Sequence, residues 1–321
     1  MKKAKGTAIV LAAALLTTVL LTACGSGKTI RLGAAGTGGV YRVFGEAYAD
    51  QQKQNGGPAL EVRETAGSAA SLRLLANGYL QMAIAQADMV QDAYNQTGVF
   101  AEFEVEHGFG TIAELYQEEC HIVVRADSDM DTVEDLQGKT VSIGEAESGT
   151  EQNAKQILAA YGLDEKLVNM VNLNYAEAEE QLKSGKIDAL FCTSGVKTEV
   201  IEELAEECGI RLLPVEGNAL TRLLAAYPGY TAGVIPAESY TGQMQDVPTV
   251  GVKAVLVASN DLSESTVKAL TQSLYDGAEQ LQNELQLTLE LMPADELDVP
   301  LHAGAAAYYQ EANMATGEAA A

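Results

Sequence analysis

Short apolar runs alternate with longer amphipathic stretches along the chain after residue 28. In 40–53, 68–76 and 147–162 the apolar residues recur at helical spacing, so each of these stretches is predicted to be a helix. The runs between the helices are bounded by Gly, Pro or Asn and read as strands: 29–34, 60–65, 82–86, 140–144, 168–173, 187–192 and 210–215. Strands that alternate with helices are typical of βαβ units, and therefore of a parallel sheet.

Two extended runs are longer than the other strands. One covers 115–125 and contains "CHIVVR", and the other reads "TVGVKAVLVAS" over 249–259. Two α/β lobes joined by two crossing segments are typical of an extracytoplasmic solute-binding protein. The prediction is an α/β, two-lobe, periplasmic-binding-protein-like fold of type II with a ligand cleft between the lobes. The first lobe is placed at 29–121 plus 256–321 and the second at 122–255.

Local signals complete the expected course of the chain. Residues 131–134 read as a capping box that opens a short helix, which Gly138 ends. Residues 98–110 read as a loop, and 227–248 as a Pro-, Gly- and Tyr-rich connection. The last helices of the chain are expected to pack on the first lobe.

The N-terminus has the pattern of an export signal. Three lysines precede a short apolar run, and "LTAC" ending at Cys24 resembles the lipobox of bacterial lipoproteins. We expect 1–23 to be a signal peptide and 24–28 a short tether, with Cys24 acylated and the protein lipid-anchored on the extracytoplasmic side of the cell membrane. The alternative is an ordinary signal peptide in which Cys24 is incidental.

Composition excludes several classes of function. The formal net charge is −25, and removal of the leader would delete three lysines and no acid, so nucleic acid is not an expected partner. The three histidines and four cysteines show no metal-ligand spacing, so neither a metal nor a cofactor is expected. Cys120, Cys192 and Cys208 are interpreted as small buried hydrophobes, although one disulfide among them stays open.

The stretch "GAAGTGGVYRVFG", residues 33–45, offers backbone with few side chains. It is not a dinucleotide fingerprint, since Tyr41 stands where the third glycine is required, and it lacks the Gly-Lys-Ser/Thr of a phosphate-binding P-loop. A lipoprotein enzyme is also not supported, because no Ser–His–Asp or Cys–His set stands out. The bare loop is instead interpreted as one that lets backbone N–H groups approach an anionic group.

Four further turns lie where strands are predicted to end. In open α/β sheets the ligand binds at the carboxyl ends of the strands, close to helix N-termini, which carry unpaired N–H groups and a partial positive charge. Several such helix starts aimed into one cleft can hold a carboxylate without an arginine. The predicted ligand-binding residues are Gly36, Thr37, Gly38, Gly39, Tyr41, Gly67, Ser68, Gln86, Asp88, Ser148, Gly149, Thr150, Thr193, Ser194 and Gly195.

Each of these residues also has a simpler interpretation. Ser68 and Ser148 are good helix caps whatever the function, and capping alone is about as frequent as ligand contact for a single turn. Tyr41 is either a wall of the site, which is preferred, or part of the core. Asp88 either caps the following helix or accepts a ligand ammonium group. Arg42 and Arg125 are weaker candidates for a carboxylate partner.

The stretches "GAAGTGGVY", "ETAGSAASLRLLANGYLQMAIAQAD" and "GKIDALFCTSG", with the long segment from "ELYQEECHIVV" to "SGTEQNAKQIL", resemble the TAXI family of TRAP-transporter receptors. The resemblance covers about 30–262. It implies a two-lobe receptor that delivers a small organic acid or amino acid, glutamate-like compounds among them, to a TRAP permease. This chain departs from the family pattern at Arg42, Ala87, 146–147 and Lys197, which favours a shifted ligand preference.

Taken together, the sequence predicts a non-enzymatic, monomeric solute receptor. Its expected ligand is a small carboxylate, namely an amino acid or a dicarboxylic or 2-hydroxy acid, and its expected partner is a TRAP permease. The alternative is a receptor of the same topology that serves an ABC importer of a sulfonate, phosphonate or thiazole compound.

Overall fold

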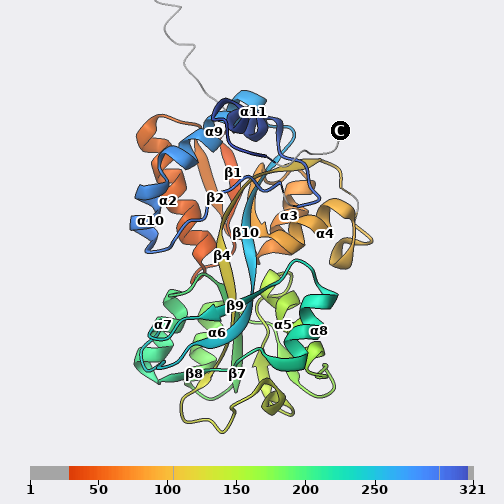
Figure 1. Cartoon of the computed structure of the whole chain (residues 1–321), viewed down its shortest axis with the longest axis vertical. Coiled ribbons are helices and arrows are strands. Elements are labelled where there is room, and N and C mark those ends of the chain that lie inside the picture. Colours follow the sequence, from red (N-terminus) through yellow and green to blue (C-terminus); the bar gives the residue numbers. More distant parts are fainter. Residues whose placement is uncertain (1–28, 104, 296, 317–321) are drawn as a thin grey trace, which may run out of the picture.

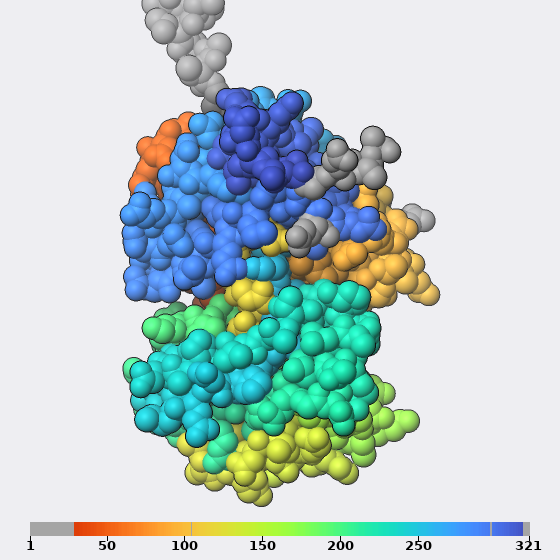
Figure 2. Space-filling model, viewed as in Figure 1, coloured from red at the N-terminus to blue at the C-terminus, as the bar shows by residue number. Residues whose placement is uncertain are grey.

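The computed structural model describes residues 29–103, 105–295 and 297–316 as two α/β lobes stacked along the long axis of the molecule (Figure 1). The predicted signal peptide, the tether and Cys24 lie outside the described residues. We call the lobe at the top of Figure 1 the first lobe and the one at the bottom the second lobe. The surface narrows to a waist where the two lobes meet (Figure 2).

The first lobe begins with three parallel strands, each followed by a helix. β1 pairs in parallel with both β2 and β3, and all five residues of β3 are buried, as expected for a strand covered on both faces. The elements are β1 (Ile30–Gly33), α2 (Val40–Asn55), β2 (Leu60–Arg63), α3 (Ser68–Ala76), β3 (Met82–Gln86) and α4 (Ala87–Asn95).

The second lobe repeats the same construction. β5 pairs in parallel with β6 and β7, and β7 is buried along its whole length. The elements are η2 (Val133–Leu136), β5 (Thr140–Ser142), α5 (Gly149–Ala160), β6 (Asn169–Val171), α6 (Tyr175–Lys183), β7 (Ala189–Ser194), α7 (Glu199–Glu207), β8 (Ile210–Leu212), α8 (Gly217–Ala226) and β9 (Thr231–Ile235).

Two long strands run through both lobes (Figure 1). β4 (Phe109–Arg125) and β10 (Val247–Ser259) pair with each other antiparallel, and the sheet has the order β2-β1-β3-β10-β4-β7-β5-β6. β4 is apolar along most of its length and almost wholly buried, because the helices of both lobes pack around it. The lobe boundaries proposed from the sequence, at 121/122 and 255/256, fall inside these two strands.

The chain returns to the first lobe at its C-terminal end. After the short η1 (Gly98–Phe100) and the two crossing strands, α9 (Glu264–Asp276), α10 (Ala278–Leu285) and α11 (Ala303–Glu311) cover the first lobe. One buried cluster joins these helices to α2 and the sheet, for example through Phe44, Leu270 and Tyr309. The end of the chain therefore stabilises the lobe that its beginning builds.

Some local predictions were wrong or incomplete. The capping box lies one residue further on, with Thr132 and Asp135 as its members, and the helix is a single 3₁₀ turn. The predicted loop at 98–110 contains η1 and the start of β4, and the connection 227–248 contains β9. Helices α4 and α8 had no clear signal beforehand. The cysteines at 120, 192 and 208 are all free, and the first two are buried.

Candidate ligand-binding site

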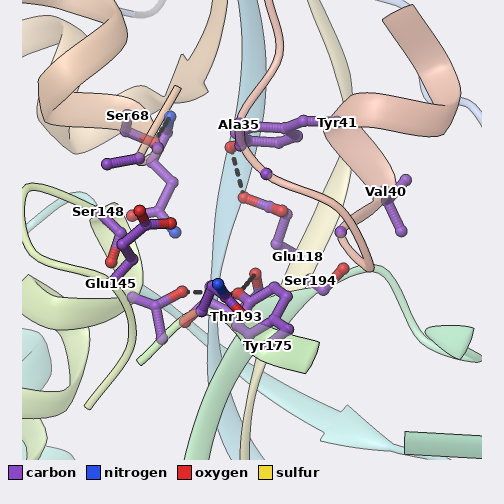
Figure 3. A pocket seen from close by; sticks show the side chains of 18 of the residues that line it. Ala35, Val40, Tyr41, Ser68, Glu118, Glu145, Ser148, Tyr175, Thr193 and Ser194 are labelled. Carbon is purple, nitrogen blue, oxygen red and sulfur yellow. Dashed lines mark hydrogen bonds between the residues drawn. The ribbon is translucent and has the colours of Figure 1, made fainter. Parts of the chain in front are cut away.

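A cavity of about 60 Å³ lies between the two lobes. By the same measure one water molecule needs about 10–15 Å³, so the space suits a small solute. Figure 3 shows its side chains converging from both lobes, with Tyr41 and Ser68 above and Ser148, Tyr175 and Thr193 below. The predicted site thus corresponds to one physical cavity rather than to scattered turns.

Twelve of the fifteen predicted ligand-binding residues line this cavity. They come from the turns after β1, β2, β3, β5 and β7, and these turns meet because the parallel strands of each lobe end towards the waist. The lining residues among the predicted ones are Gly36, Thr37, Gly39, Tyr41, Gly67, Ser68, Gln86, Ser148, Gly149, Thr150, Thr193 and Ser194.

Three predicted residues do not line the cavity. Gly38 has φ +88°, so it supplies the left-handed turn that places Thr37 and Gly39. Asp88 Oδ1 accepts a 2.8 Å hydrogen bond from the backbone N–H of Met89, and a Cβ on Gly229 would lie 2.9 Å from Asp88 Cβ, so Asp88 faces the 229 segment. Gly195 packs on apolar atoms instead, since a Cβ there would lie 2.8 Å from Leu287 Cδ1.

Helices α2, α3, α5 and α6 begin at the cavity, as does α4 after Gln86, and the first four differ in how their first N–H groups are satisfied. Ser148 Oγ accepts from the N–H of Glu151 at 3.0 Å, and Asn174 caps α6 in a complete capping box. The caps of α2 and α3 are Gly39 and Gly67, and neither offers a side-chain hydrogen bond. The starts of α2 and α3 therefore keep N–H groups available for a bound anion.

None of the described residues that line the cavity is Lys, Arg or His. Arg42 turns away to pair with Glu46 and Glu64, and Arg125 pairs with Asp127 at 2.6 Å. An anion in this cavity would consequently rely on backbone N–H groups, hydroxyl groups and helix dipoles.

Glu118 of β4 lies at the centre of the cavity (Figure 3) and is 2% exposed. Its Oε2 accepts a 2.7 Å hydrogen bond from the hydroxyl of Tyr41. Burial raises the pKa of Glu118 to about 8, and hydrogen bonds from Tyr41 and Gln86 only partly oppose this effect. Burial, followed by the nearby Glu118, likewise raises the pKa of Tyr41 well above its ordinary value. Tyr41 is therefore both a wall of the cavity and the partner of its central carboxyl group.

Sequence reasoning missed several lining residues: Ala35, Val40, Ala66, Glu118, Glu145, Asn174 and Tyr175. The two glutamates of "QEEC" were a usable signal, because a carboxyl group inside a long apolar strand requires an explanation. Glu145 directly follows the predicted strand 140–144, and burial raises its pKa, with Glu64 and Glu177 adding to the shift. Tyr175 had no local signal, since only the packing of α6 brings it to the cavity.

Two buried polar atoms of the lining have no hydrogen-bond partner in the described structure. They are Oε1 of Gln86 and Oγ of Ser194, in side chains that are 2% and 1% exposed. A buried polar atom without a partner is costly, and native proteins rarely keep one without a functional reason. Within the cavity these two atoms are free to bond to a solute or to a water molecule.

The lobes are in direct contact beside the cavity, between the α3 and β3 region of the first lobe and the start of α5 in the second. The N–H of Ala70 donates to the backbone oxygen of Glu147 at 3.1 Å, and Gln86 Nε2 donates to Asn153 Oδ1 at 3.0 Å. A Cβ on Gly67 would lie 2.8 Å from Cα of Ser148. Such contacts require the two lobes to be closed on one another, so the structure corresponds to a closed conformation.

Two lobes, two crossing strands and a cavity at the waist that both lobes line define a solute-binding protein of the periplasmic-binding-protein type. The chain belongs to the NMT1-like family, whose match covers residues 32–312.

Solved structures agree on the fold. The periplasmic binding protein BugD is 14% identical, with 89% of this chain and 94% of that chain covered and a TM-score of 0.56. The binding protein component of an ABC phosphonate transporter from Pseudomonas aeruginosa is 14% identical, with 83% and 82% covered and a TM-score of 0.51. The ATP-bound protein XAC2383 from Xanthomonas citri is 10% identical, with 88% and 99% covered and a TM-score of 0.52.

The resemblance to TRAP-associated TAXI receptors is wrong as an assignment. The family that matches is the NMT1-like one, and a transporter component of this fold among the solved structures belongs to an ABC system. The error has a physical origin. Gly-Ser and Gly-Thr turns at strand ends are what any helix-start anion site requires, so these motifs describe the site and not the membrane partner.

Within the described ranges no helix is long and apolar enough to cross a bilayer. The same part of the chain contains no cluster of three or more His, Cys, Asp or Glu side chains that could hold a metal ion.

Proposed function

We propose that this protein is the extracytoplasmic substrate-binding component of an ABC importer for a small phosphonate or sulfonate. The fold shared with BugD and with the phosphonate-transporter component supports a transport receptor. Because fold alone does not determine function, the choice of ligand rests on the cavity.

The observation that carries the proposal is the pair of helix starts at α2 and α3. Their caps, Gly39 and Gly67, offer no side-chain acceptor, and both residues line the cavity. N–H groups at a helix start, together with the helix dipole, bind phosphate-like and sulfate-like oxygens without any cationic side chain. Ser68 and Thr150 add hydroxyl groups to the same cavity.

Capture follows from the two-lobe construction. A solute that contacts both lobes stabilises the closed state relative to the open one, and the crossing strands β4 and β10 provide the hinge. The contacts between Gln86 and Asn153 and between Ala70 and Glu147 then form on closure. The closed, loaded form is the one that a permease distinguishes from the empty receptor.

Thermal unfolding with a panel of small acids tests this function. A ligand at about one hundred times its Kd stabilises the protein by ~2.7 kcal/mol, which gives a clear rise in Tm. The panel contains alkylphosphonates, alkylsulfonates, carboxylates and a thiazole without an acid group. A rise in Tm with phosphonates or sulfonates supports the proposal. If only the carboxylates or only the thiazole raise the Tm, the proposed ligand class is wrong.

We further propose that the mature protein is held at the membrane by a lipid on Cys24. The "LTAC" motif supports this proposal, and only a few residues separate Cys24 from β1, so the first lobe would lie close to the membrane surface.

A further inference from the structure

The cavity combines helix starts suited to an anion with carboxyl groups that repel one. Glu118 is buried at its centre, Glu145 lies in its lining, and no Lys, Arg or His among the described residues balances them there. The titratable groups coupled to Glu118 are all acids as well: Tyr41, Tyr116, Tyr175, Asp88, Cys120 and Cys192. A purely anionic solute would therefore require Glu118 to stay protonated, because an ionised Glu118 would have no counter-charge in the cavity.

The buried polar atoms without a hydrogen-bond partner also favour a solute with hydrogen-bond donors. Gln86 Oε1 can only accept a hydrogen bond, and Ser194 Oγ can accept one. Gln86 Oε1 and an ionised Glu118 both call for a donor, whereas the hydroxyl of Ser194 can accept from a solute or donate to it. An ammonium group has three donors and a positive charge, so it suits Glu118 and Gln86 Oε1 better than an anion does.

From this arrangement we infer that the solute carries a cationic amine in addition to its acid group, and that Glu118 binds the amine. This inference rests on the proposed function and extends it to aminoalkyl phosphonates or sulfonates. The acid group lies at the starts of α2 and α3, and the amine lies between Glu118, Gln86 and Ser194. Tyr41 acts as a positioning residue, because its hydroxyl group fixes one carboxylate oxygen of Glu118.

The competing arrangement is a protonated Glu118 that donates a hydrogen bond to the acid group. The two arrangements differ in whether Glu118 releases its proton when the solute binds. In the closed structure burial raises the pKa of Glu118 to about 8, so at pH 7 an ammonium group bound beside it displaces the carboxyl proton. Binding of an amine therefore releases a proton, whereas a protonated Glu118 that donates to an anion keeps its own.

Matched pairs of compounds test the inference by isothermal titration calorimetry. The pairs are 2-aminoethylphosphonate with ethylphosphonate and 2-aminoethanesulfonate with ethanesulfonate, and each pair is repeated with a propyl chain. Titrations at pH 7 in two buffers of different ionisation enthalpy give the number of protons released. In at least one pair we expect the amino compound to bind at least about tenfold more tightly, with proton release, because a buried ion pair forms only with that compound.

Two variants test whether Glu118 causes the preference for the amino compound and the proton release. Glu118→Gln should reduce the preference for the amino compound by about tenfold or more and abolish the proton release. The matched control is Glu119→Gln, which removes the next carboxyl group on the same strand; Glu119 does not line the cavity and should leave both readouts unchanged. If Glu118→Gln does not fold, the proton count of the unmodified protein decides by itself.

The outcomes separate the two proposals. If the amine-free acids bind as tightly as the amino compounds, or binding releases no proton, the inference fails and the proposed function stands. If no compound of the panel binds, both fail.

Discussion

Gln86 Nε2 donates a 3.0 Å hydrogen bond to Oδ1 of Asn153, and this bond joins β3 of the first lobe to α5 of the second. Both side chains are buried, and Tyr230 fixes Asn153 by accepting a 2.6 Å hydrogen bond from its Nδ2. Gln86 also lines the cavity. A side chain that lines the cavity and is bonded to the opposite lobe is placed to couple ligand binding to lobe closure.

Gly149→Ala should weaken this closure. Gly149 is the first residue of α5, and a Cβ there would lie 2.1 Å from Gln86 Oε1, so the Gln86 amide has to move and give up its bond to Asn153, or the two lobes stay further apart; either outcome weakens the closed state. Since the backbone of Gly149 needs no positive φ, the open protein should fold normally. We expect at least about a tenfold loss of affinity with the Tm of the free protein unchanged, measured by calorimetry and thermal unfolding.

The matched control is Gly162→Ala at the other end of the same helix. Gly162 has φ +76° and open space around its Cβ position, so the substitution should cost about 1 kcal/mol of stability and leave the affinity unchanged. Equal affinity losses in both variants would refute the role of the Gly149–Gln86 contact.

Tyr41→Phe should weaken ligand binding while leaving the fold intact. The substitution removes only the hydroxyl group that holds Glu118 Oε2, so the carboxyl group loses a donor and its pKa rises further. Loss of one buried hydrogen bond costs about 1 kcal/mol in the free energy of unfolding. Urea denaturation measures this cost, and calorimetry of the best amino compound should show weaker binding with altered proton release.

Tyr48→Phe is the control that shows whether the loss of affinity in Tyr41→Phe comes from the contact with Glu118 or from the loss of any buried tyrosine hydroxyl group. Tyr48 is also fully buried in α2, and its hydroxyl donates a 2.8 Å hydrogen bond to the backbone oxygen of Leu270, away from the cavity. Its substitution should cost similar stability with no change in affinity. If both variants bind equally well, Tyr41 does not position Glu118.

The site could be predicted from sequence where its chemistry is local. Gly39, Gly67 and Ser148 lie at strand-to-helix turns. Three or four consecutive residues determine a turn of this kind, so the sequence alone can reveal it. The parallel strands then bring the turns to one edge, so correctly placed strand ends were enough to gather them. Gly195 was predicted in the same way but does not line the cavity, because it packs against Leu287 from a distant part of the chain.

The central carboxyl group could not be placed in the same way. Glu118 and Glu119 are adjacent, and strand alternation sends them to opposite faces, but only the position of β4 between the lobes decides which one faces the cavity. Tyr175 reaches the cavity through the packing of α6. The residues that line the cavity also do not determine which membrane protein the receptor serves. This explains why the turn motifs led to the wrong assignment, the TAXI family.

Cys24→Ala should release the protein from the membrane. Without the thiol no acyl chain can be attached, and among residues 29–316, as far as the structure describes them, no helix is long and apolar enough to cross a bilayer. We expect the unmodified protein in the membrane fraction with a mass increased by its lipid, and the variant in the soluble fraction. Cys208→Ala is the control and should stay with the membrane. A variant from which residues 1–23 have been removed, as its mass shows, and which still remains membrane-bound would show that Cys24 is not the anchor.

The pH dependence of stability provides an independent test of the burial of Glu118. The folded protein holds the pKa of Glu118 at about 8, above its ordinary value of 4.5, so between these pH values the folded state keeps a proton that the unfolded chain has released. The free energy of unfolding should therefore fall as pH rises, by up to ~1.4 kcal/mol per pH unit from this group alone.

Asp88, whose pKa burial raises to about 6, and Glu119, raised to about 7, add slopes of the same sign, so the comparison has to be made with a variant. Glu118→Gln removes only the contribution of Glu118. Its stability relative to the unmodified protein should consequently be higher at pH 8.5 than at pH 5, measured by urea denaturation without ligand. Parallel pH curves for the two proteins would show that Glu118 is solvated in the free protein, and a solvated carboxyl group would not need an amine to balance it.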